Sequence, residues 1–171
     1  MAKAVKKSVP KKKKAAVAKR AVKPAPAAPR KGTLGFTAKT AKEITATFQD
    51  RIGLTAKVAA AVAAANVNIL AATGYSASGM RRNATFNLIV DDFVKAERAL
   101  EKIGAEDIHE ESVIMVETPN RVGALEQVAK IIADAGIDIY YFYATTSSGK
   151  TATSVIKTAD DARTIKALQR A

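Results

Sequence analysis

Two short loops carry the residues with the clearest chemical potential; they read DRIG and NRVG and begin at Asp50 and Asn120. Each loop directly precedes a stretch with helical periodicity. The unpaired N–H groups of a helix N-terminus attract a carboxylate, and the short acceptors of Asp50 and Asn120 can take an ammonium group. Gly53 and Gly123 have no Cβ, so the backbone can approach a ligand closely. The loops therefore predict sites for a small ligand that carries a carboxylate and an ammonium group.

The two loops occupy equivalent positions of an internal repeat. Residues 45–79 align with residues 115–149 at a constant offset of 70 without a gap, and beyond Gly79 the offset falls to 68. The identical pairs include Arg51/Arg121, Gly53/Gly123, Val58/Val128, Ile69/Ile139 and Gly79/Gly149. A period near 70 residues is too long for a solenoid unit. The repeat therefore predicts two copies of one small domain.

Hydrophobic periodicity gives the same order of elements in both copies. In the first copy it predicts strands over 43–48, 67–75 and 83–90, helices over 54–65 and 93–103, and a short strand within 105–111. In the second copy it predicts strands over 112–118, 137–146 and 151–157, and helices over 124–135 and from 160 onward. The final strand of the second copy has no counterpart in the sequence that follows. The order is that of the ferredoxin-like βαββαβ arrangement.

These elements predict an α+β protein with two tandem ferredoxin-like domains, each an antiparallel sheet with helices on one face. We expect a disordered Lys/Ala/Pro-rich tail over 1–42, a first domain over 43–111 and a second domain over 112–171. Residues 140–143 read YYFY, and strand alternation places Tyr141 and Tyr143 on one face and Tyr140 and Phe142 on the other. We expect one pair in the core and the other pair at a contact between sheets.

The charge is divided between the tail and the body. Residues 1–42 hold 14 Lys and Arg and no acid, whereas the remaining residues hold 14 Lys and Arg against 16 Asp and Glu. A polycationic segment of this kind binds polyanions such as nucleic acid through counterion release and without sequence preference. The cations that would make this contact include Lys11, Lys12, Lys13, Lys14, Lys19 and Arg20. A solubilising extension and a contact with an anionic membrane surface are the alternatives.

Several classes of protein are disfavoured by composition. There is no Cys and only one His, so thiolate zinc sites, cysteine nucleophiles and multi-histidine metal sites are excluded. No apolar run approaches the ~18 residues of a membrane span. We find no catalytic constellation and expect neither an enzyme, nor a metal, nor a cofactor. We expect a cytoplasmic protein, associated with the nucleoid if its tail binds DNA, with no membrane partner.

In both copies, two motifs resemble those of ACT domains, the small amino-acid-sensing modules. One is the loop at Asp50 or Asn120, and the other is the helix end and second strand, which reads ANVNI in the first copy and AGIDI in the second. The family has a proline where Ile52 and Val122 stand here. The resemblance covers about residues 43–170 and implies a regulatory protein that binds an amino acid and forms a homodimer.

The resemblance also implies which residues bind the ligand. In ACT proteins the loop of one domain faces the start of the second strand of a paired domain, and the ligand lies between them. Carried to this chain, the ligand-binding residues are Asp50, Gly53, Leu54, Asn68, Ile69, Asn120, Arg121, Gly123, Ala124, Leu125 and Asp138. If the two copies of one chain pair with each other, one site combines Asn120 with Asn68. The other combines Asp50 with Asp138, which repels a carboxylate. On that premise only the Asn120/Asn68 site binds an amino acid.

Two functions remain open at this point. In the first, the protein is an amino-acid-binding regulator whose tail tethers it to a polyanion. In the second, it is an architectural nucleic-acid-binding protein whose ACT body only forms a dimer. Stabilisation of the body by an amino acid distinguishes the first from the second, because a ligand that binds only the folded state raises the melting temperature.

Overall fold

The computed structural model of the chain describes residues 34–76, 83–146 and 149–171. The tail cations from Lys11 to Arg20 and the turn residues 77–79 lie outside the described residues, so the expectations that concern them remain predictions. No helix in the described ranges is long and apolar enough to cross a membrane.

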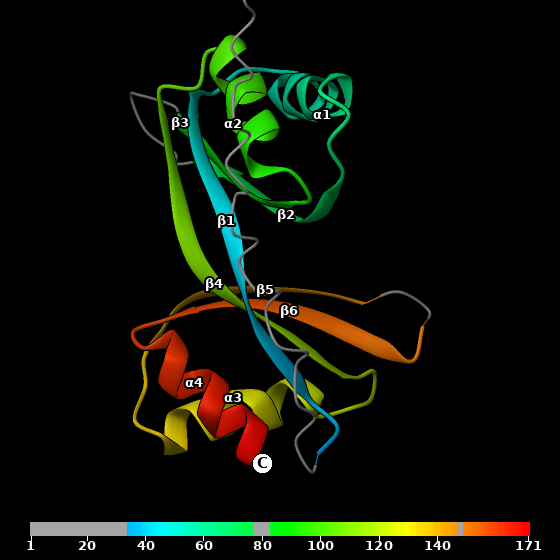
Figure 1. The fold of residues 1–171 in the computed structure, drawn as a ribbon, viewed down its shortest axis with the longest axis vertical. Helices are drawn as coiled ribbons and strands as arrows, with labels where there is room; N and C mark the ends of the chain where they lie inside the picture. Colours follow the sequence, from blue (N-terminus) through cyan, green and yellow to red (C-terminus); the bar gives the residue numbers. More distant parts are fainter. Residues whose placement is uncertain (1–33, 77–82, 147–148) are drawn as a thin grey trace, which may run out of the picture.

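Six strands form one continuous antiparallel sheet in the order β2-β3-β1-β4-β6-β5 (Figure 1). The strands are β1 (Thr37–Gln49), β2 (Ile69–Ser76), β3 (Asn83–Val90), β4 (Asp107–Pro119), β5 (Ile139–Thr146) and β6 (Thr151–Thr158). The helices are α1 (Leu54–Ala64), α2 (Phe93–Lys102), α3 (Ala124–Asp134) and α4 (Asp161–Arg170). The sheet curls, so that β5 and β6 cross the direction of the upper strands steeply in Figure 1.

Two long strands, β1 and β4, belong to both halves of the molecule. They pair without interruption from Thr37 opposite Glu117 to Thr47 opposite Asp107. The second part of β1 and the first part of β4 complete a four-stranded sheet with β2 and β3. The remaining parts of β1 and β4 complete a second one with β5 and β6. Each half therefore has the ferredoxin-like order of strands, and the two expected sheets are one sheet.

The first strand begins six residues earlier than the sequence indicates. Residues 37–42 were assigned to the tail, but they pair with β4 and form the edge strand of the second half. This segment supplies the strand that the second copy lacks. Its composition, TAKTAK, resembles the tail. Only two apolar side chains in this region indicate that it is buried, Phe36 just before the segment and Ala38 within it, and they are 1% and 2% exposed. The stretch around 105–111 and the strand at 112–118 are likewise one strand, β4.

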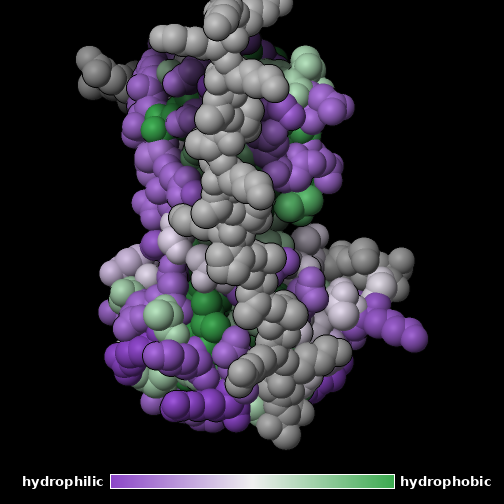
Figure 2. Space-filling view, viewed as in Figure 1, coloured by the Kyte–Doolittle hydropathy of each residue, from purple (hydrophilic) through white to green (hydrophobic). Residues whose placement is uncertain are grey.

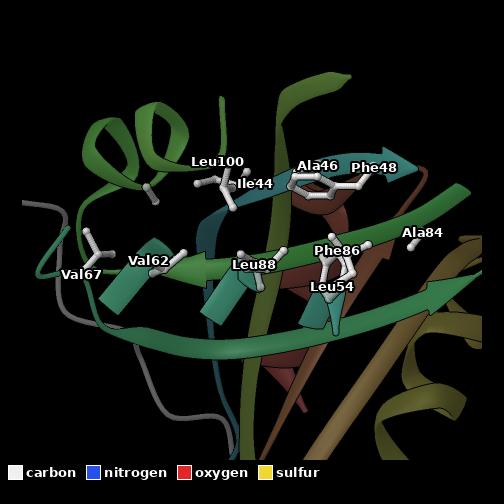
Figure 3. Close-up of a cluster of buried hydrophobic side chains, with 12 residues drawn as sticks. Ile44, Ala46, Phe48, Leu54, Val62, Val67, Ala84, Phe86, Leu88 and Leu100 are labelled. Carbon is white, nitrogen blue, oxygen red and sulfur yellow. The ribbon is translucent and has the colours of Figure 1, made fainter. Parts of the chain in front are cut away.

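The helices lie on one face of the curled sheet, at its two ends. In the first half, Ile44, Phe48 and Phe86 point toward α1 and α2, and Figure 3 shows their side chains with Leu54 and Leu100. The rings of Phe48 and Phe86 meet edge to face at 5.9 Å. In the second half, Phe36, Ala38, Ile114, Val116 and Ile156 pack under α3 and α4 with Val128, Ile132 and Leu168.

Local sequence explains where the helices begin and end. Asp92 and Asp160 cap α2 and α4 by accepting hydrogen bonds from Lys95 N and Arg163 N at 3.1 and 2.9 Å. The helices were expected within one residue of these bounds. At the start of α3, Ala124 is buried and Leu125 is 42% exposed.

If residues 36–42 belong to the second half, a core variant in this segment must destabilise the protein. Replacing Phe36 with Ala removes a buried aromatic ring and is expected to lower the free energy of unfolding by about 3 kcal/mol. Leu34→Ala is the matched control, because Leu34 is 38% exposed, and it should cost well under 1 kcal/mol. Urea unfolding of the full chain measures both values, and equal stability of the two variants would contradict the placement of this strand.

Candidate functional site

Two pockets open at the helix N-termini that the sequence singled out. Gly53 and Gly123 adopt left-handed backbone conformations with φ of 85° and 82°, which residues with a Cβ rarely adopt. Neither helix has a side-chain cap. In α1 the first intrahelical hydrogen bond runs from Lys57 N to Gly53 O at 3.0 Å. The N–H groups of Thr55 and Ala56 therefore have no acceptor within the helix.

The first pocket, of about 450 Å³, lies between the start of α1 and strand β2. It is lined by Asp50, Gly53, Leu54 and Ile69, which were predicted ligand residues, together with Thr55, Ala72, Gly74, Tyr75, Ser76 and Phe86. Ser76 donates a hydrogen bond to Asp50 Oδ2 at 2.7 Å, which holds this carboxylate at the pocket. The pocket thus joins an acidic side chain to an uncapped helix N-terminus.

The second pocket is smaller, about 210 Å³, and differs in charge. It is lined by the predicted residues Asn120, Arg121, Ala124 and Leu125, and by Ala144 and Thr145 of β5. Asn120 Nδ2 donates to Gly149 O at 3.2 Å, and Arg121 donates to Gln127 Oε1 at 2.6 Å. The first turn of α3 carries Glu126, whereas the first turn of α1 carries no acid. A carboxylate at the start of α3 would meet this negative charge.

The difference in size between the two pockets depends on one glycine. Gly74 of β2 corresponds to Ala144 of β5, and a Cβ added at Gly74 would lie 3.0 Å from the ring of Phe86. Phe86 forms part of the wall of the first pocket beside Leu54, as Figure 3 shows. At the position equivalent to Phe86 the second half has Ser154. The exchange of a glycine over a large ring for an alanine over a serine gives each pocket its own shape.

The structure does not bring the predicted second-strand residues to these loops within one chain. Ile69 pairs with Val90, and Leu88 pairs with Ile44, so β2 begins level with the middle of the β1–β4 ladder. Asn120 follows the far end of β4, more than half of that strand away from Asn68, or roughly 20 Å at about 3.3 Å per residue. Asp50 and Asp138 are separated in the equivalent way. The copies do not pair side by side, so the intrachain Asn120/Asn68 site is not formed.

Asn68 and Asp138 instead form hydrogen bonds that hold the chain in place directly before β2 and β5. Asn68 N donates to Asp91 Oδ1 at 2.9 Å, and Asp138 O accepts from Ala159 N at 3.0 Å. Neither residue lines either pocket. Their side chains are exposed, so they remain available to a second molecule.

A buried carboxylate that sequence reasoning missed connects the two halves. Glu43 of β1 is fully buried on the face of the sheet that carries no helix, beside Val113, Ile89 and Val155. Tyr141 donates a hydrogen bond to Glu43 Oε1, and Tyr143 donates to Glu43 Oε2 at 2.6 Å. The expectation that Tyr141 and Tyr143 share one face is thereby confirmed. The sequence signal that could have identified Glu43 is an acidic residue between Ala41 and Ile44 of a strand, because a carboxylate that is buried in a strand needs a polar partner.

These hydrogen bonds link the strands that border the two pockets. Tyr143 precedes Ala144 of β5, which lines the second pocket, and Glu43 lies on β1, which ends at Gln49, directly before Asp50 of the first pocket. Burial, and then the hydrogen bond to Glu43, raise the pKa of both tyrosines well above their usual 10.0. Both hydroxyl groups therefore stay protonated and keep donating at neutral pH.

Within the described ranges, no group of three or more His, Asp or Glu side chains could hold a metal ion.

No protein-family profile matches the chain, and no curated protein sequence matches it either. Solved structures do match. Protein BT0572 from Bacteroides thetaiotaomicron is 25% identical, with 77% of this chain and 88% of that chain covered and a TM-score of 0.67. The ligand-free regulatory subunit of aspartate kinase from Thermus thermophilus is 19% identical, with 78% and 93% covered and a TM-score of 0.56.

A structure of aspartokinase alpha and beta subunits is 18% identical, with 82% of this chain and 96% of that chain covered and a TM-score of 0.55. The chain shares the fold of these structures. This confirms the α+β, ferredoxin-like architecture expected from the order of the elements in the sequence.

The tyrosine hydrogen bonds to Glu43 predict how stability depends on pH. A tyrosine whose pKa is raised on folding stabilises the protein fully below the unfolded value near 10, and this contribution is lost as pH rises above it. We expect the free energy of unfolding to decline above pH 10, and to decline less steeply in the Tyr141→Phe/Tyr143→Phe double variant. Urea unfolding between pH 8 and pH 11 measures both slopes, with Tyr140→Phe as control. Equal slopes in the double variant and the wild type would contradict this account.

Proposed function

We propose that the protein is a regulator that binds a small amino acid in the first pocket. The single observation that carries this proposal is the juxtaposition of the Asp50 carboxylate with the uncapped, acid-free N-terminus of α1 around a pocket of about 450 Å³. The helix N-terminus is suited to the α-carboxylate of the ligand, and Asp50 to its α-ammonium group. The ACT-like fold, which it shares with regulatory subunits of aspartate kinase, supports the same function.

The choice of pocket differs from the choice that the sequence alone favours. Sequence reasoning preferred the second copy because Asn120 and Asn68 would form an amide pair. In the structure this pair lies too far apart within a chain, the second pocket has about 210 Å³, and Glu126 opposes a carboxylate there. The walls of the first pocket, Leu54, Ala72 and Phe86, are apolar and favour an aliphatic or aromatic side chain.

We further propose that the protein acts as a homodimer. The sheet ends at β2 and β5, and both edge strands expose large apolar side chains: Leu70, Tyr75, Tyr140 and Phe142. An exposed apolar edge strand tends to pair with another chain. The aromatic pair Tyr140 and Phe142 on β5 makes this edge the better interface, in line with the expectation that one of the two aromatic pairs lies at a contact between sheets.

The basic tail is proposed to tether the regulator to a polyanion such as nucleic acid in the cytoplasm. Its support is the charge distribution, since residues 1–36, which precede β1, carry twelve cations without an acid. The architectural alternative, in which the ACT body only forms the dimer, rests on this same tail. It differs in predicting that no amino acid stabilises the protein.

Amino-acid binding is tested by thermal melting of the full chain with each of the twenty amino acids. A ligand present at about one hundred times its Kd adds about 2.7 kcal/mol, so one or two amino acids should raise the Tm by several degrees. Thr55→Glu places an acid in the first turn of α1 and should abolish the shift, because its charge repels the carboxylate. An exposed acid at this position does not harm the helix itself.

Leu125→Glu is the matched control, because it places the same acid at the equivalent position of the exposed start of α3. This variant should keep the full shift. Loss of the shift in Leu125→Glu with retention in Thr55→Glu would move the site to the second pocket. If none of the twenty amino acids raises the Tm of the wild type, amino-acid binding is refuted and the architectural function is the one that remains.

The proposed interface is tested by two charge substitutions at equivalent positions of the edge strands. Tyr140→Lys on β5 should convert the dimer to a monomer, because it places a cation in the apolar contact, whereas Leu70→Lys on β2 should leave the dimer intact. Sedimentation equilibrium of the full chain measures the mass of each variant. A wild-type monomer, or dissociation caused by Leu70→Lys alone, would refute this interface.

A further inference from the structure

A further groove, separate from the two pockets at the helix N-termini, lies between α1 and α2 at one end of the molecule (Figure 1). Its volume is about 420 Å³. The apolar part of its lining is Ile103 together with four small side chains: Ala61, Ala64, Ala65 and Ala99. Three cations of α2 form the polar part: Lys95, Arg98 and Lys102. In Figure 2, pale green and purple side chains lie next to each other at this end of the molecule. The groove therefore joins an apolar surface to a row of positive charge.

No acid among the described residues lines this groove, although α2 carries two. At about 100° per residue, Glu97 and Glu101 lie about 160° around the helix from Ala99, so they point away from the groove. Helix α1 carries no acid. Asp92, which caps α2, lies with its Oδ2 2.8 Å from Lys95 Nζ and compensates this cation. Asp92 therefore offsets the charge at the Lys95 end of the row and leaves the charge at the other end.

The cations at that other end have few partners within the protein. Arg98 and Lys102 are exposed, and in the part of the chain that the structure describes they take part in no ion pair. Asp92 acts on Arg98 only at longer range. Lys57 of α1 donates a hydrogen bond to Ile103 O at 2.9 Å, which adds a further positive charge beside Lys102. A cation in the last turn stabilises a helix through its dipole, which explains Lys102 in part but not Arg98.

The second half has larger side chains at the positions that open the groove in the first half. Ile131 and Asp134 of α3 stand where α1 has Ala61 and Ala64. The Ile131 side chain is partly buried against the second core. Asp134 pairs with Lys130 at 3.0 Å. The second half therefore has bulk and a carboxylate where the first half has an alanine surface beside free cations.

A hydrogen bond also joins the ends of the two helices in the second half. Arg163, at the position equivalent to Lys95, donates to Ala135 O at 2.6 Å. The residue equivalent to Ala135 in the first half is Ala65, which lines the groove, and Lys95 pairs with Asp92 instead. Since the two halves share one fold, the fold itself does not require the open groove. The alanines and cations of the first half therefore need a separate explanation.

We propose that the groove between α1 and α2 docks an acidic amphipathic helix of a partner protein. Apolar side chains of such a helix cover the alanines, and its carboxylates reach Arg98 and Lys102. The small alanine side chains let the backbone of an incoming helix approach closely. The row from Lys95 to Lys102 spans about 10 Å, or about two turns of the incoming helix, so its acids are spaced by three or four residues. This inference goes beyond amino-acid binding, because it concerns a protein that the chain contacts.

The chemistry of the groove distinguishes this partner from two other occupants. The phosphate backbone of a nucleic acid pairs with cations but has no apolar side chains to cover the alanines. A second copy of this chain offers no described helix with an acidic face. Helix α1 has no acid, and α2 and α4 each have more cations than acids. In α3, Lys130 lies one turn from both Glu126 and Asp134.

The probe for the test is a displayed library of amphipathic helices with Glu, Gln or Lys at each polar position. It is selected on the full chain, and helices with Glu spaced by three or four residues should be enriched. The enriched peptide is then synthesised with a fluorescent label. Fluorescence anisotropy measures its Kd for the wild type and for matched variants of the full chain.

Two single variants of α1 test the alanine surface. Ala64→Asp places in the groove the acid that α3 has at the equivalent position, and it should raise the Kd about tenfold or more by repelling the carboxylates of the peptide. Ala63→Asp is the matched control, because it adds the same charge to the same turn at an exposed position outside the groove. This variant should keep the wild-type Kd.

Two double variants with equal loss of charge test the cations. Arg98→Gln/Lys102→Gln should raise the Kd about tenfold, whereas Lys166→Gln/Arg170→Gln, at the equivalent positions of α4, should leave it unchanged. All four side chains are exposed, so equal melting temperatures of the two variants confirm that folding does not cause the difference.

Enrichment of helices without acids, or an equal change of Kd within either matched pair, would overturn the inference. Weaker binding of duplex DNA by Arg98→Gln/Lys102→Gln, with an unchanged Kd for the peptide, would overturn it by assigning the cations to nucleic acid. A lower mass of Ala64→Asp in sedimentation equilibrium would assign the groove to a second copy of the chain and overturn it as well. None of these results bears on amino-acid binding, which thermal melting of the same chain tests separately.

Discussion

The pairing of β1 with β4 is the interaction on which the rest of the structure depends. Each strand is long enough to serve two small sheets, and their uninterrupted ladder turns two copies of a ferredoxin-like unit into one curled sheet. The second copy has no complete sheet without residues 37–42, which lie outside its own repeat. The same ladder sets the pockets far apart, because the loops at Asp50 and Asn120 follow opposite ends of it. The Glu43 carboxylate sits near its middle, where hydrogen bonds from β5 reach across the curled sheet.

Much of the architecture follows from local pattern in the sequence. The helices were expected within one residue of their observed bounds, since capping aspartates and apolar spacing mark them, and the ferredoxin-like order followed from the repeat. The start of β1 was missed because residues 37–42 read as more of the basic tail. Only pairing with β4, some 80 residues later at Glu117, makes this segment a strand. Such long-range pairing produces little pattern in the local sequence, and the joining of the two sheets into one produces no pattern at all.

The candidate site was predicted less completely than the fold. The loops, their glycines and the helix N-termini are where the sequence placed them, because a strand-to-helix turn is a local feature. The shape of each pocket depends on residues from other strands, such as Gly74 and Phe86, which no short motif identifies. The expected pairing of Asn120 with Asn68 failed within one chain because it requires the copies to lie side by side. Register, which is a property of the whole sheet, excludes that arrangement.

The interleaved order of the strands also constrains how the chain can acquire its structure during synthesis. The residues around Phe36 leave the ribosome first, yet their strand partner in β4 and their helical cover in α4 come more than 70 residues later. The first half needs only residues 43–111 and can fold as soon as they have been synthesised. The second half also needs the start of β1, so it folds after the first half. Loop closure of this length slows folding far more than it lowers stability. A nascent chain of this protein therefore spends much of its synthesis with the start of β1 unpaired.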